Sequence, residues 1–280
     1  MDNSKKIKVF IVDDQRVVRN VIRKMLTTDP QIEVVGEASN PFEASELIPE
    51  VEPDVLTLDV EMPRMDGVEF LKKLMPQYPI PVIMVSSTTE EGSEKAIQAM
   101  QNGAIDFVTK PDGGAITLES TQEELIQKVK NASTVNIERW LKQVRYKSFA
   151  PTLNQGVVKS FKSKYNLIAI GASTGGVTAI RQVLSTVPRD FPCIVITQHM
   201  PPGFTATFAK GVSKDYGLDV REAKDQDVIQ TGRIYVAPGD YHLIVNRRNG
   251  NIHTVGLTRA EKVNGHRPSV DVLFNSIAQN

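Results

Sequence analysis

Hydrophobic and polar positions follow a repeating pattern along residues 7–130. Short apolar runs rich in β-branched residues are each followed by a longer segment with apolar positions at helical spacing. The apolar runs predict five strands, at 8–12, 33–38, 55–58, 82–86 and 106–109. The longer segments predict helices at 16–28, 41–48, 67–75, 91–102 and 121–135. This alternation predicts a parallel sheet with helices on both faces.

The pattern loosens between residues 136 and 165, where Lys and Ser accumulate around Pro151 and Gly156. We expect a linker there, with a helix at its start around Trp140. A basic linker could instead contact a polyanion, but this charge density favours a solvated segment. The expected organisation is therefore a first domain at 1–130, a linker at 131–164 and a second domain at 165–280.

A second α/β pattern begins at residue 166. It predicts strands at 167–170, 193–197, 219–222 and 234–236, and helices at 177–187 and 205–216. Two further strands, at 242–245 and 251–255, surround Asn249-Gly250, a dipeptide typical of hairpin turns. A last helix is expected from about Ser269, and the chain ends within it. We therefore expect the second domain to be incomplete.

Composition narrows the class of protein. The 280 residues carry a formal net charge of +0, which indicates no bulk attraction to nucleic acid or to a membrane surface. The one cysteine, Cys193, excludes an internal disulfide, lies in an apolar run and fits a reducing, cytoplasmic setting. No apolar run approaches about 18 residues, and the N-terminus lacks the pattern of a signal peptide, so we expect no membrane insertion.

Five chemically matched residues stand at the ends of the first domain's predicted strands. Asp13 and Asp14 follow the first strand, Asp59 the third and Lys110 the fifth, and Ser86 ends the fourth. In a parallel sheet these positions meet at one edge. Three carboxylates there call for a divalent cation, for which Mg²⁺ is suited, and a carboxylate beside it can attack phosphorus. A solvated or capping role would explain one such residue, but not all five together.

Four stretches of the first domain resemble, in order, the response-regulator receiver family. They are FIVDD at 10–14, LDVEMPRMDG at 58–67, VS at 85–86 and FVTKP at 107–111. The resemblance implies a flavodoxin-like (βα)5 fold over about residues 6 to 130. It implies that Asp59 accepts a phosphoryl group.

The same resemblance implies further roles. The Mg²⁺ ligands would be Asp13, Asp14, Asp59 and the main-chain carbonyl of Glu61. Ser86 and Lys110 would contact the phosphoryl group. Phe107 matches the aromatic switch position, for which core packing is the alternative.

The second domain contains a serine on a predicted strand-to-helix turn. Gly171-Ala172-Ser173-Thr174-Gly175 fits G-x-S-x-G, the pattern of a nucleophile elbow. The competing interpretation, a dinucleotide phosphate loop, needs glycine where Ser173 stands. His199 follows the next predicted strand, and adjacent strands lie roughly 5 Å apart. His199 is therefore the candidate general base, and capping of the strand end is the alternative role.

The other three histidines are weaker candidates. His253 is expected in the hairpin and His242 after the Gly239-Asp240 dipeptide, while His266 precedes the last helix. None has the spacing of a metal ligand set.

Four stretches of the second domain resemble the chemotaxis protein-glutamate methylesterase (CheB) family. They are IGASTGG at 170–176, QHMP at 198–201, VAPGD at 236–240 and HRPSVDVLF at 266–274. A receiver, a linker and this domain are that family's architecture. The resemblance implies a Rossmann-like parallel-sheet esterase domain without a cofactor, with Ser173 as nucleophile and His199 as base. Thr174 and Gly175 would supply oxyanion and turn geometry.

The resemblance also implies substrates and partners. Methyl-accepting chemotaxis receptors would be demethylated at glutamate methyl esters and deamidated at glutamines. The chemotaxis histidine kinase would be the phosphodonor. In the family, the unphosphorylated receiver covers the catalytic cleft, and phosphorylation relieves that block.

One departure from the family pattern concerns the third catalytic residue. The family's triad Asp lies in a T-G-M-G-x-D-G stretch after the helix that begins at Ser269, and these 280 residues do not contain it. Asp240 and Asp271 do not match that position. From a C-terminally truncated chain we expect weak or no esterase activity and a less stable second domain.

A receiver joined to a second domain is compatible with two other functions. The alternative to an esterase is a catalytically impaired receiver-plus-docking module. A DNA-binding regulator is disfavoured because no helix-turn-helix with a basic recognition helix follows the linker.

Overall fold

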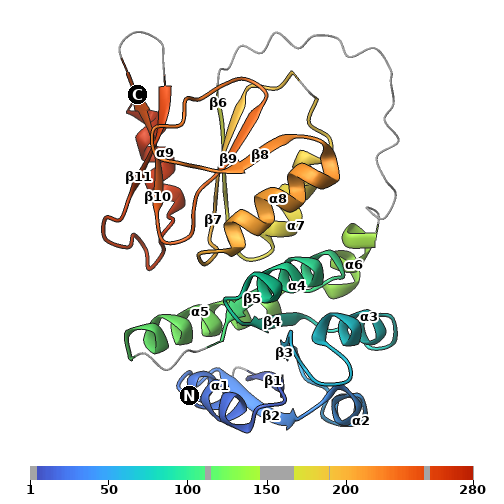
Figure 1. Cartoon of the computed structure of the whole chain (residues 1–280). Helices are drawn as coiled ribbons and strands as arrows, with labels where there is room; N and C mark the ends of the chain where they lie inside the picture. Colours follow the sequence, from blue (N-terminus) through green and yellow to red (C-terminus); the bar gives the residue numbers. More distant parts are fainter. Residues whose placement is uncertain (1–4, 111–114, 146–166, 189, 249–252, 280) are drawn as a thin grey trace. The chain divides into compact units, whose positions relative to one another are not determined.

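The computed structural model describes residues 5–110, 115–145, 167–188, 190–248 and 253–279. Its chain divides into two compact units, Met1–Ser148 and Phe149–Asn280 (Figure 1). Among the described residues, no helix has the length and apolar character needed to cross a bilayer.

The first unit contains a five-stranded parallel sheet in the order β2-β1-β3-β4-β5. Its strands are β1 (Ile7–Val12), β2 (Ile32–Ala38), β3 (Val55–Asp59), β4 (Val82–Ser86) and β5 (Asp106–Thr109). Its helices are α1 (Arg16–Thr27), α2 (Pro41–Val51), α3 (Gly67–Gln77), α4 (Glu90–Gln101), α5 (Ala115–Ser133) and α6 (Ile137–Arg145). The central strands β1, β3 and β4 are apolar along most of their length, as expected for a sheet with helices on both faces.

Side-chain caps fix where several of these helices begin. Asn40 accepts hydrogen bonds from the amides of Phe42 and Glu43 at the start of α2. Asp66 and Thr89 cap α3 and α4 in the same way. Gly67 lets α3 begin close against the main chain of β3, because a Cβ there would lie 2.0 Å from the carbonyl oxygen of Asp59. The carboxyl end of β3 is thereby held against a helix start.

Helix α6 extends the first unit beyond residue 130. Its Trp140 indole donates to the carbonyl of Gly103 at 3.0 Å, and Leu141 is buried beside it. Ile137 and Trp140 pack against the core cluster formed by the sheet, α1 and α5. The first part of the expected linker is thus helical and packed, and residues 146–164 lie outside the described residues.

The second unit contains a four-stranded parallel sheet in the order β6-β7-β9-β8 and a two-stranded antiparallel hairpin, β10-β11. The strands are β6 (Leu167–Ala172), β7 (Cys193–Gln198), β8 (Asp219–Glu222), β9 (Arg233–Val236), β10 (His242–Arg247) and β11 (His253–Thr258). The helices are α7 (Gly176–Leu184), α8 (Phe204–Tyr216) and α9 (Val270–Ala278). The expected Asn249-Gly250 turn lies outside the described residues.

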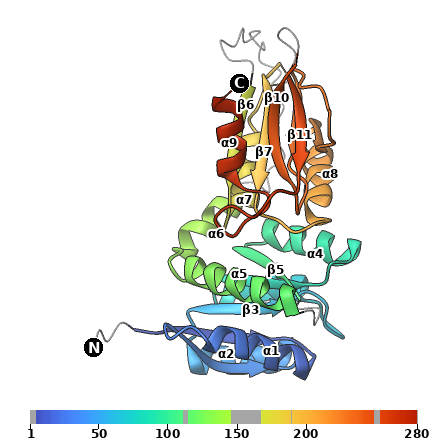
Figure 2. The same cartoon turned by 90° about the vertical axis from the view of Figure 1, so that its left-hand side faces the viewer.

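Helices α7 and α8 lie on one face of the second sheet, and α9 with the hairpin lies on the other (Figures 1 and 2). The second face is closed by a cluster that includes Cys193, Tyr235, Val245 and Leu273. Strands β6 and β7 run in register up to the pair Ala172 and Gln198. The residues that follow this pair therefore lie side by side.

Candidate functional site

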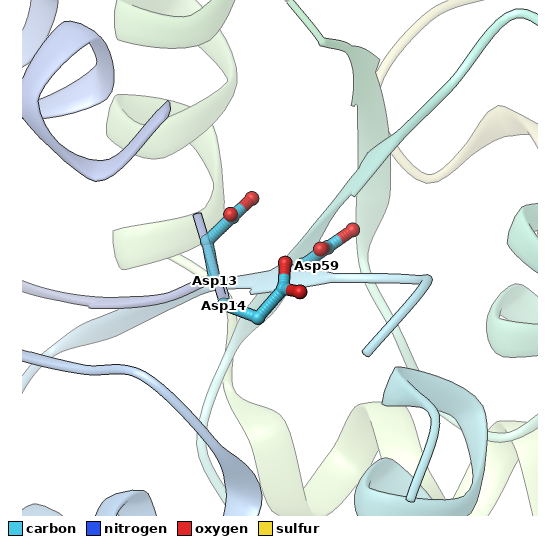
Figure 3. Close-up of side chains that lie close together, drawn as sticks. All are labelled: Asp13, Asp14 and Asp59. Atoms are coloured by element: carbon cyan, nitrogen blue, oxygen red, sulfur yellow. The ribbon is translucent and has the colours of Figure 1, made fainter. Parts of the chain in front are cut away.

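Three carboxylates meet at the carboxyl edge of the first sheet. Asp13 and Asp14 follow β1, Asp59 ends β3, and one ligand atom of each lies within 4.8 Å of the others. Figure 3 shows the three side chains turned toward a common space. Asp13 and Asp59 are fully buried. The structure thus brings together the three acidic residues that the sequence placed at this edge.

Lys110 is the cation of this cluster. Its Nζ lies 2.8 Å from Asp59 Oδ2 and 3.3 Å from Asp13 Oδ2. Burial, and then the charge of Asp13, raise the pKa of Asp59 to about 6. Burial also raises the pKa of Asp13. For Lys110, burial acts to lower the pKa, but its hydrogen bond to Asp59 and the negative charge of Asp59 outweigh burial, so the pKa of Lys110 is raised. One lysine therefore only partly neutralises two buried carboxyl groups.

A divalent cation would complete this charge balance, and the donor set fits one. All three side chains offer hard oxygen ligands, which Mg²⁺ prefers. Asp14 Oδ1 is buried and has no hydrogen-bond partner among the described residues. A buried oxygen of this kind calls for a ligand.

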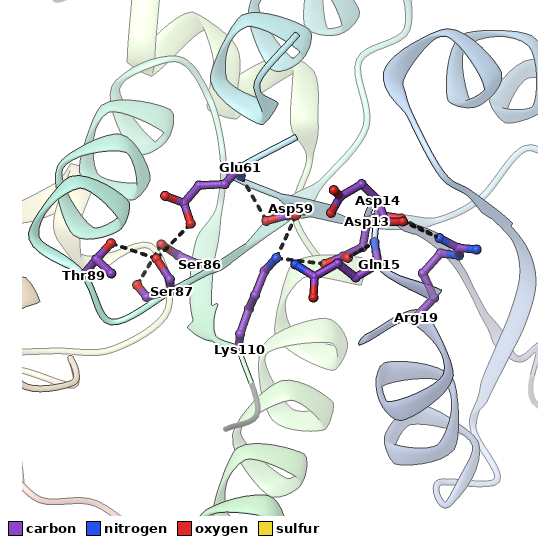
Figure 4. A network of polar contacts seen from close by, with 10 residues as sticks. All are labelled: Asp13, Asp14, Gln15, Arg19, Asp59, Glu61, Ser86, Ser87, Thr89 and Lys110. Carbon is purple, nitrogen blue, oxygen red and sulfur yellow. Dashed lines mark hydrogen bonds and ion pairs between the residues drawn. The ribbon is translucent and has the colours of Figure 1, made fainter. Parts of the chain in front are cut away.

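The residues around the cluster form a polar network (Figure 4). The amide of Glu61 donates to Asp59 Oδ1 at 3.0 Å, and its carboxylate accepts from Ser87 Oγ at 2.9 Å. Ser86 lies at the end of β4 but donates to the carbonyl of Gly92 at 2.9 Å. The Ser86 hydroxyl is thus engaged with α4, and Lys110 is the predicted phosphoryl contact that reaches Asp59.

Sequence reasoning missed Arg19, which supports the acidic pair from α1. Its Nη1 donates to the carbonyls of Asp13 and Asp14 at 2.8 and 3.3 Å. Its Nε lies 3.5 Å from Glu37 on β2. Arg19 is the fourth residue of α1, and its place in the sequence gave no signal for this contact.

Phe107 is buried on β5 beneath a lysine. Lys128 Nζ lies 5.2 Å from the Phe107 ring centroid and donates to the Phe107 carbonyl at 2.6 Å. The same ammonium lies 3.2 Å from Asp106 and 2.7 Å from Glu124. The predicted switch aromatic is therefore tied to α5 by a buried charge cluster.

Ser173 and His199 stand at the carboxyl ends of β6 and β7 in the second unit. Ser173 Oγ and His199 Nδ1 are 3.1 Å apart, a hydrogen-bond distance. The main chain continues the strand pairing by one step, because the His199 amide donates to the Ala172 carbonyl at 3.2 Å. Ser173 is exposed and His199 is half-buried. A hydroxyl and an imidazole in this relation can exchange a proton.

The turn after Ser173 opens α7. Gly175 has a φ of 75°, which favours glycine, and no side chain caps the helix. The Gly176 amide donates to the Ser173 carbonyl at 2.7 Å, which closes the turn. Gly175 thus lets α7 begin beside the serine, where main-chain amides favour negative charge.

His266 was a weaker candidate in the sequence, yet it lies against His199. The two rings are stacked, with centroids 3.8 Å apart and planes inclined by 18°. The neighbouring Arg267 donates to Asp240 Oδ1 at 2.6 Å and to the Ala260 carbonyl at 3.0 Å. These contacts hold the loop that carries His266. Because His266 is far from His199 in the sequence, the contact between their rings could not be predicted from spacing.

The remaining candidates lie elsewhere. His242 is fully buried between the Ser269 amide and the Glu261 carbonyl. Asp240 accepts from Arg267, and Asp271 accepts from Asn264 at 2.6 Å.

Comparison with known proteins gives matches over both units. Residues 9–121 match the response regulator receiver domain family, and residues 168–280 match the CheB methylesterase family. A protein-glutamate methylesterase/protein-glutamine glutaminase of Sulfurimonas denitrificans is 44% identical over 97% of this chain and 78% of its own length.

Two solved structures from Thermotoga maritima are also similar. The response regulator domain of CheB shares 43% identity over 47% of this chain and 99% of that chain, with a TM-score of 0.43. The CheB methylesterase catalytic domain shares 36% identity over 42% of this chain and 62% of that chain, with a TM-score of 0.40.

Proposed function

Because the chain belongs to the family of CheB protein-glutamate methylesterases/protein-glutamine glutaminases, we propose that its second unit hydrolyses glutamate methyl esters and deamidates glutamines on chemoreceptors. By family the chain is a hydrolase of chemotaxis, a carboxylic ester hydrolase and amidase. The observation that carries the proposal is the 3.1 Å contact between Ser173 Oγ and His199 Nδ1.

In the proposed reaction, Ser173 Oγ attacks the ester carbonyl while His199 takes the hydroxyl proton. For Nδ1 to accept that proton, the neutral ring carries its hydrogen on Nε2. The carbonyl–methoxy bond then breaks, and His199 returns the proton so that methanol leaves. Water attacks the acyl-serine by the same proton transfers and releases the glutamate carboxylate. With glutamine the leaving group is ammonia.

Replacing Ser173 tests this assignment. With chemoreceptor bearing labelled methyl esters, Ser173→Ala should lower the parent's methanol release to the level without protein, because the nucleophile is gone. Ser185→Ala, at the end of α7, is the matched control and should release methanol at the parent rate. Equal release above the level without protein would remove Ser173 from the mechanism, whereas release at that level from both proteins would favour a docking role for the second unit.

For the first unit we propose phosphorylation at Asp59, with the chemotaxis histidine kinase as phosphodonor. A carboxylate oxygen of Asp59 attacks phosphorus, the bond to the donor atom breaks, and an acyl phosphate forms. Asp13, Asp14, Asp59 and the Glu61 carbonyl would hold Mg²⁺, which supplies positive charge to the phosphoryl oxygens when bound. Lys110 supplies a second positive charge from its position 2.8 Å from Asp59. Ser86 would need to leave Gly92 to reach the phosphoryl group.

Acetyl phosphate with Mg²⁺ tests the acceptor. Intact-mass measurement should show one added phosphoryl group on the parent chain and none on Asp59→Asn. Asp54→Asn, at a partly exposed position before β3, should be labelled like the parent. Undiminished labelling of Asp59→Asn would move the acceptor to another residue.

A further inference from the structure

One polar side chain takes no part in the chemistry proposed for either unit, yet it contacts the main chain of both Ser173 and His199. Gln198 is the last residue of β7 and is 1% exposed. Its Nε2 lies 3.0 Å from the Ser173 carbonyl oxygen and 3.3 Å from the His199 carbonyl oxygen. A glutamine amide has two N–H donors, so one side chain holds the main chain of both residues.

The neighbouring glycine makes room for this amide. A Cβ at Gly176 would lie 1.9 Å from Gln198 Oε1 and 2.7 Å from the Ala172 Cβ. The amide therefore occupies the space in which any other side chain at 176 would begin. Its Oε1 is buried and has no hydrogen-bond partner among the described residues. Burying an oxygen without a hydrogen bond costs free energy. The hydrogen bonding of its own amide atoms therefore does not fully explain why Gln198 lies here.

We propose that Gln198 is a positioning residue that fixes the distance between Ser173 Oγ and His199 Nδ1. The residue pairing of β6 and β7 ends at Ala172 and Gln198, and the His199 amide adds one further hydrogen bond, to the Ala172 carbonyl. Beyond the last residue pair of the strands, the planar Gln198 amide donates to the carbonyls of both Ser173 and His199 and so links their main chains. This inference rests on the proposed roles of Ser173 and His199.

Two substitutions separate positioning from packing. Gln198→Met keeps the length of the side chain and removes both donors. Gln198→Glu keeps the shape, but its carboxylate has no donor and faces two carbonyl oxygens; once protonated, it regains one donor. Gln182→Met and Gln182→Glu, at an exposed position of α7, are the matched controls.

The first measurement is the rate at which a fluorophosphonate probe labels Ser173 in the folded full chain, as a function of pH. A loss of about tenfold to 100-fold is expected for Gln198→Met at every pH, because small misplacements of reacting groups are costly. Gln198→Glu should lose as much at high pH and recover relative to Gln198→Met as the pH falls. Equal rates in Gln198→Met and Gln182→Met, or a loss that only follows the unfolded fraction, would overturn the proposal.

The second measurement does not depend on serine reactivity. The His199 ring proton resonances, assigned with His199→Gln, should be single and sharp in the parent and in Gln182→Met. They should broaden or double in Gln198→Met, because the base is no longer held. An unchanged His199 signal in Gln198→Met would overturn the proposal. Probe labelling that survives Ser173→Ala would instead contradict the proposed function, and the ring signals would still decide the role of Gln198.

Discussion

The surroundings of the Asp59 carboxyl group disfavour its charged form. It is fully buried, and Asp13 lies beside it. Burial raises the pKa of Asp59 to about 6, well above the roughly 3.9 of an exposed aspartate. The folded first unit therefore holds this proton more tightly than the unfolded chain does. The resulting stabilisation is complete below about pH 4 and is lost as the pH rises through about 6.

Asp59→Asn should consequently stabilise the first unit at neutral pH in the presence of a chelator. We expect a gain of about 1–3 kcal/mol in the free energy of unfolding near pH 7.5, shrinking toward zero as the pH falls below about 4. Urea titrations at several pH values measure it. Glu46→Gln, at an exposed position of α2, should show no such pH-dependent gain. A constant difference between Asp59→Asn and the parent across this range would contradict the expectation.

Individual site residues differed in how far the sequence could locate them. The positions of Asp13, Asp59, Ser173 and His199 follow from strand ends in a parallel sheet. The role of Arg19 in holding the acidic pair could not be predicted, because it depends on where a helix lies on the sheet. The stacking of His266 on His199 depends on the path of a loop, which no spacing encodes.

Two helices run further than the sequence pattern predicts, and each passes a proline. The pattern predicts helices ending at residues 48 and 75, directly before Pro49 and Pro76, and a proline lacks the amide that continues a helix. Both continue past Pro49 and Pro76, to Val51 and Gln77. After each proline a later amide restores the pattern: Glu52 donates to Ile48 and Tyr78 to Leu74, at 3.0 and 2.7 Å. Most strand bounds were predictable because central strands are short, apolar and β-branched.

The junction of β5 and α5 depends on one buried cation. Lys128→Met should leave Asp106 buried without its partner and lower the free energy of unfolding of the first unit by about 3–5 kcal/mol. Urea titration measures the loss. In Asp106→Asn/Lys128→Met no charge remains on either residue, so the double variant should lose less than the sum of the single changes. A Lys128→Met variant as stable as the parent would contradict this account.

At the scale of the molecule, each unit has its own core and its own spectroscopic or chemical reporter. The single tryptophan, Trp140, packs in the first unit. The single cysteine, Cys193, is fully buried in the second, and burial raises the pKa of its thiol to about 12. Near pH 8 the native thiol is almost entirely protonated, so a thiol reagent reacts with it only after the second unit opens.

Mg²⁺ should therefore act on one reporter and not on the other. We expect it to raise the urea midpoint followed by Trp140 fluorescence, since a cation that binds only the folded first unit stabilises that unit. The midpoint followed by Cys193 labelling should stay in place. Asp13→Asn should abolish the fluorescence shift. Equal Mg²⁺ shifts of both midpoints would mean that the two units unfold as one.

The pairing of Ala172 with Gln198 also bears on how such a gene can change over generations. A substitution in β6 or β7 alters one side chain and leaves the ladder in place. Inserting or deleting one codon moves every later residue of that strand by one place and turns it to the opposite face. Ser173 and His199 would then separate although both remained in the chain. In these two strands, lineages that keep the serine–histidine pair should accumulate substitutions while preserving length.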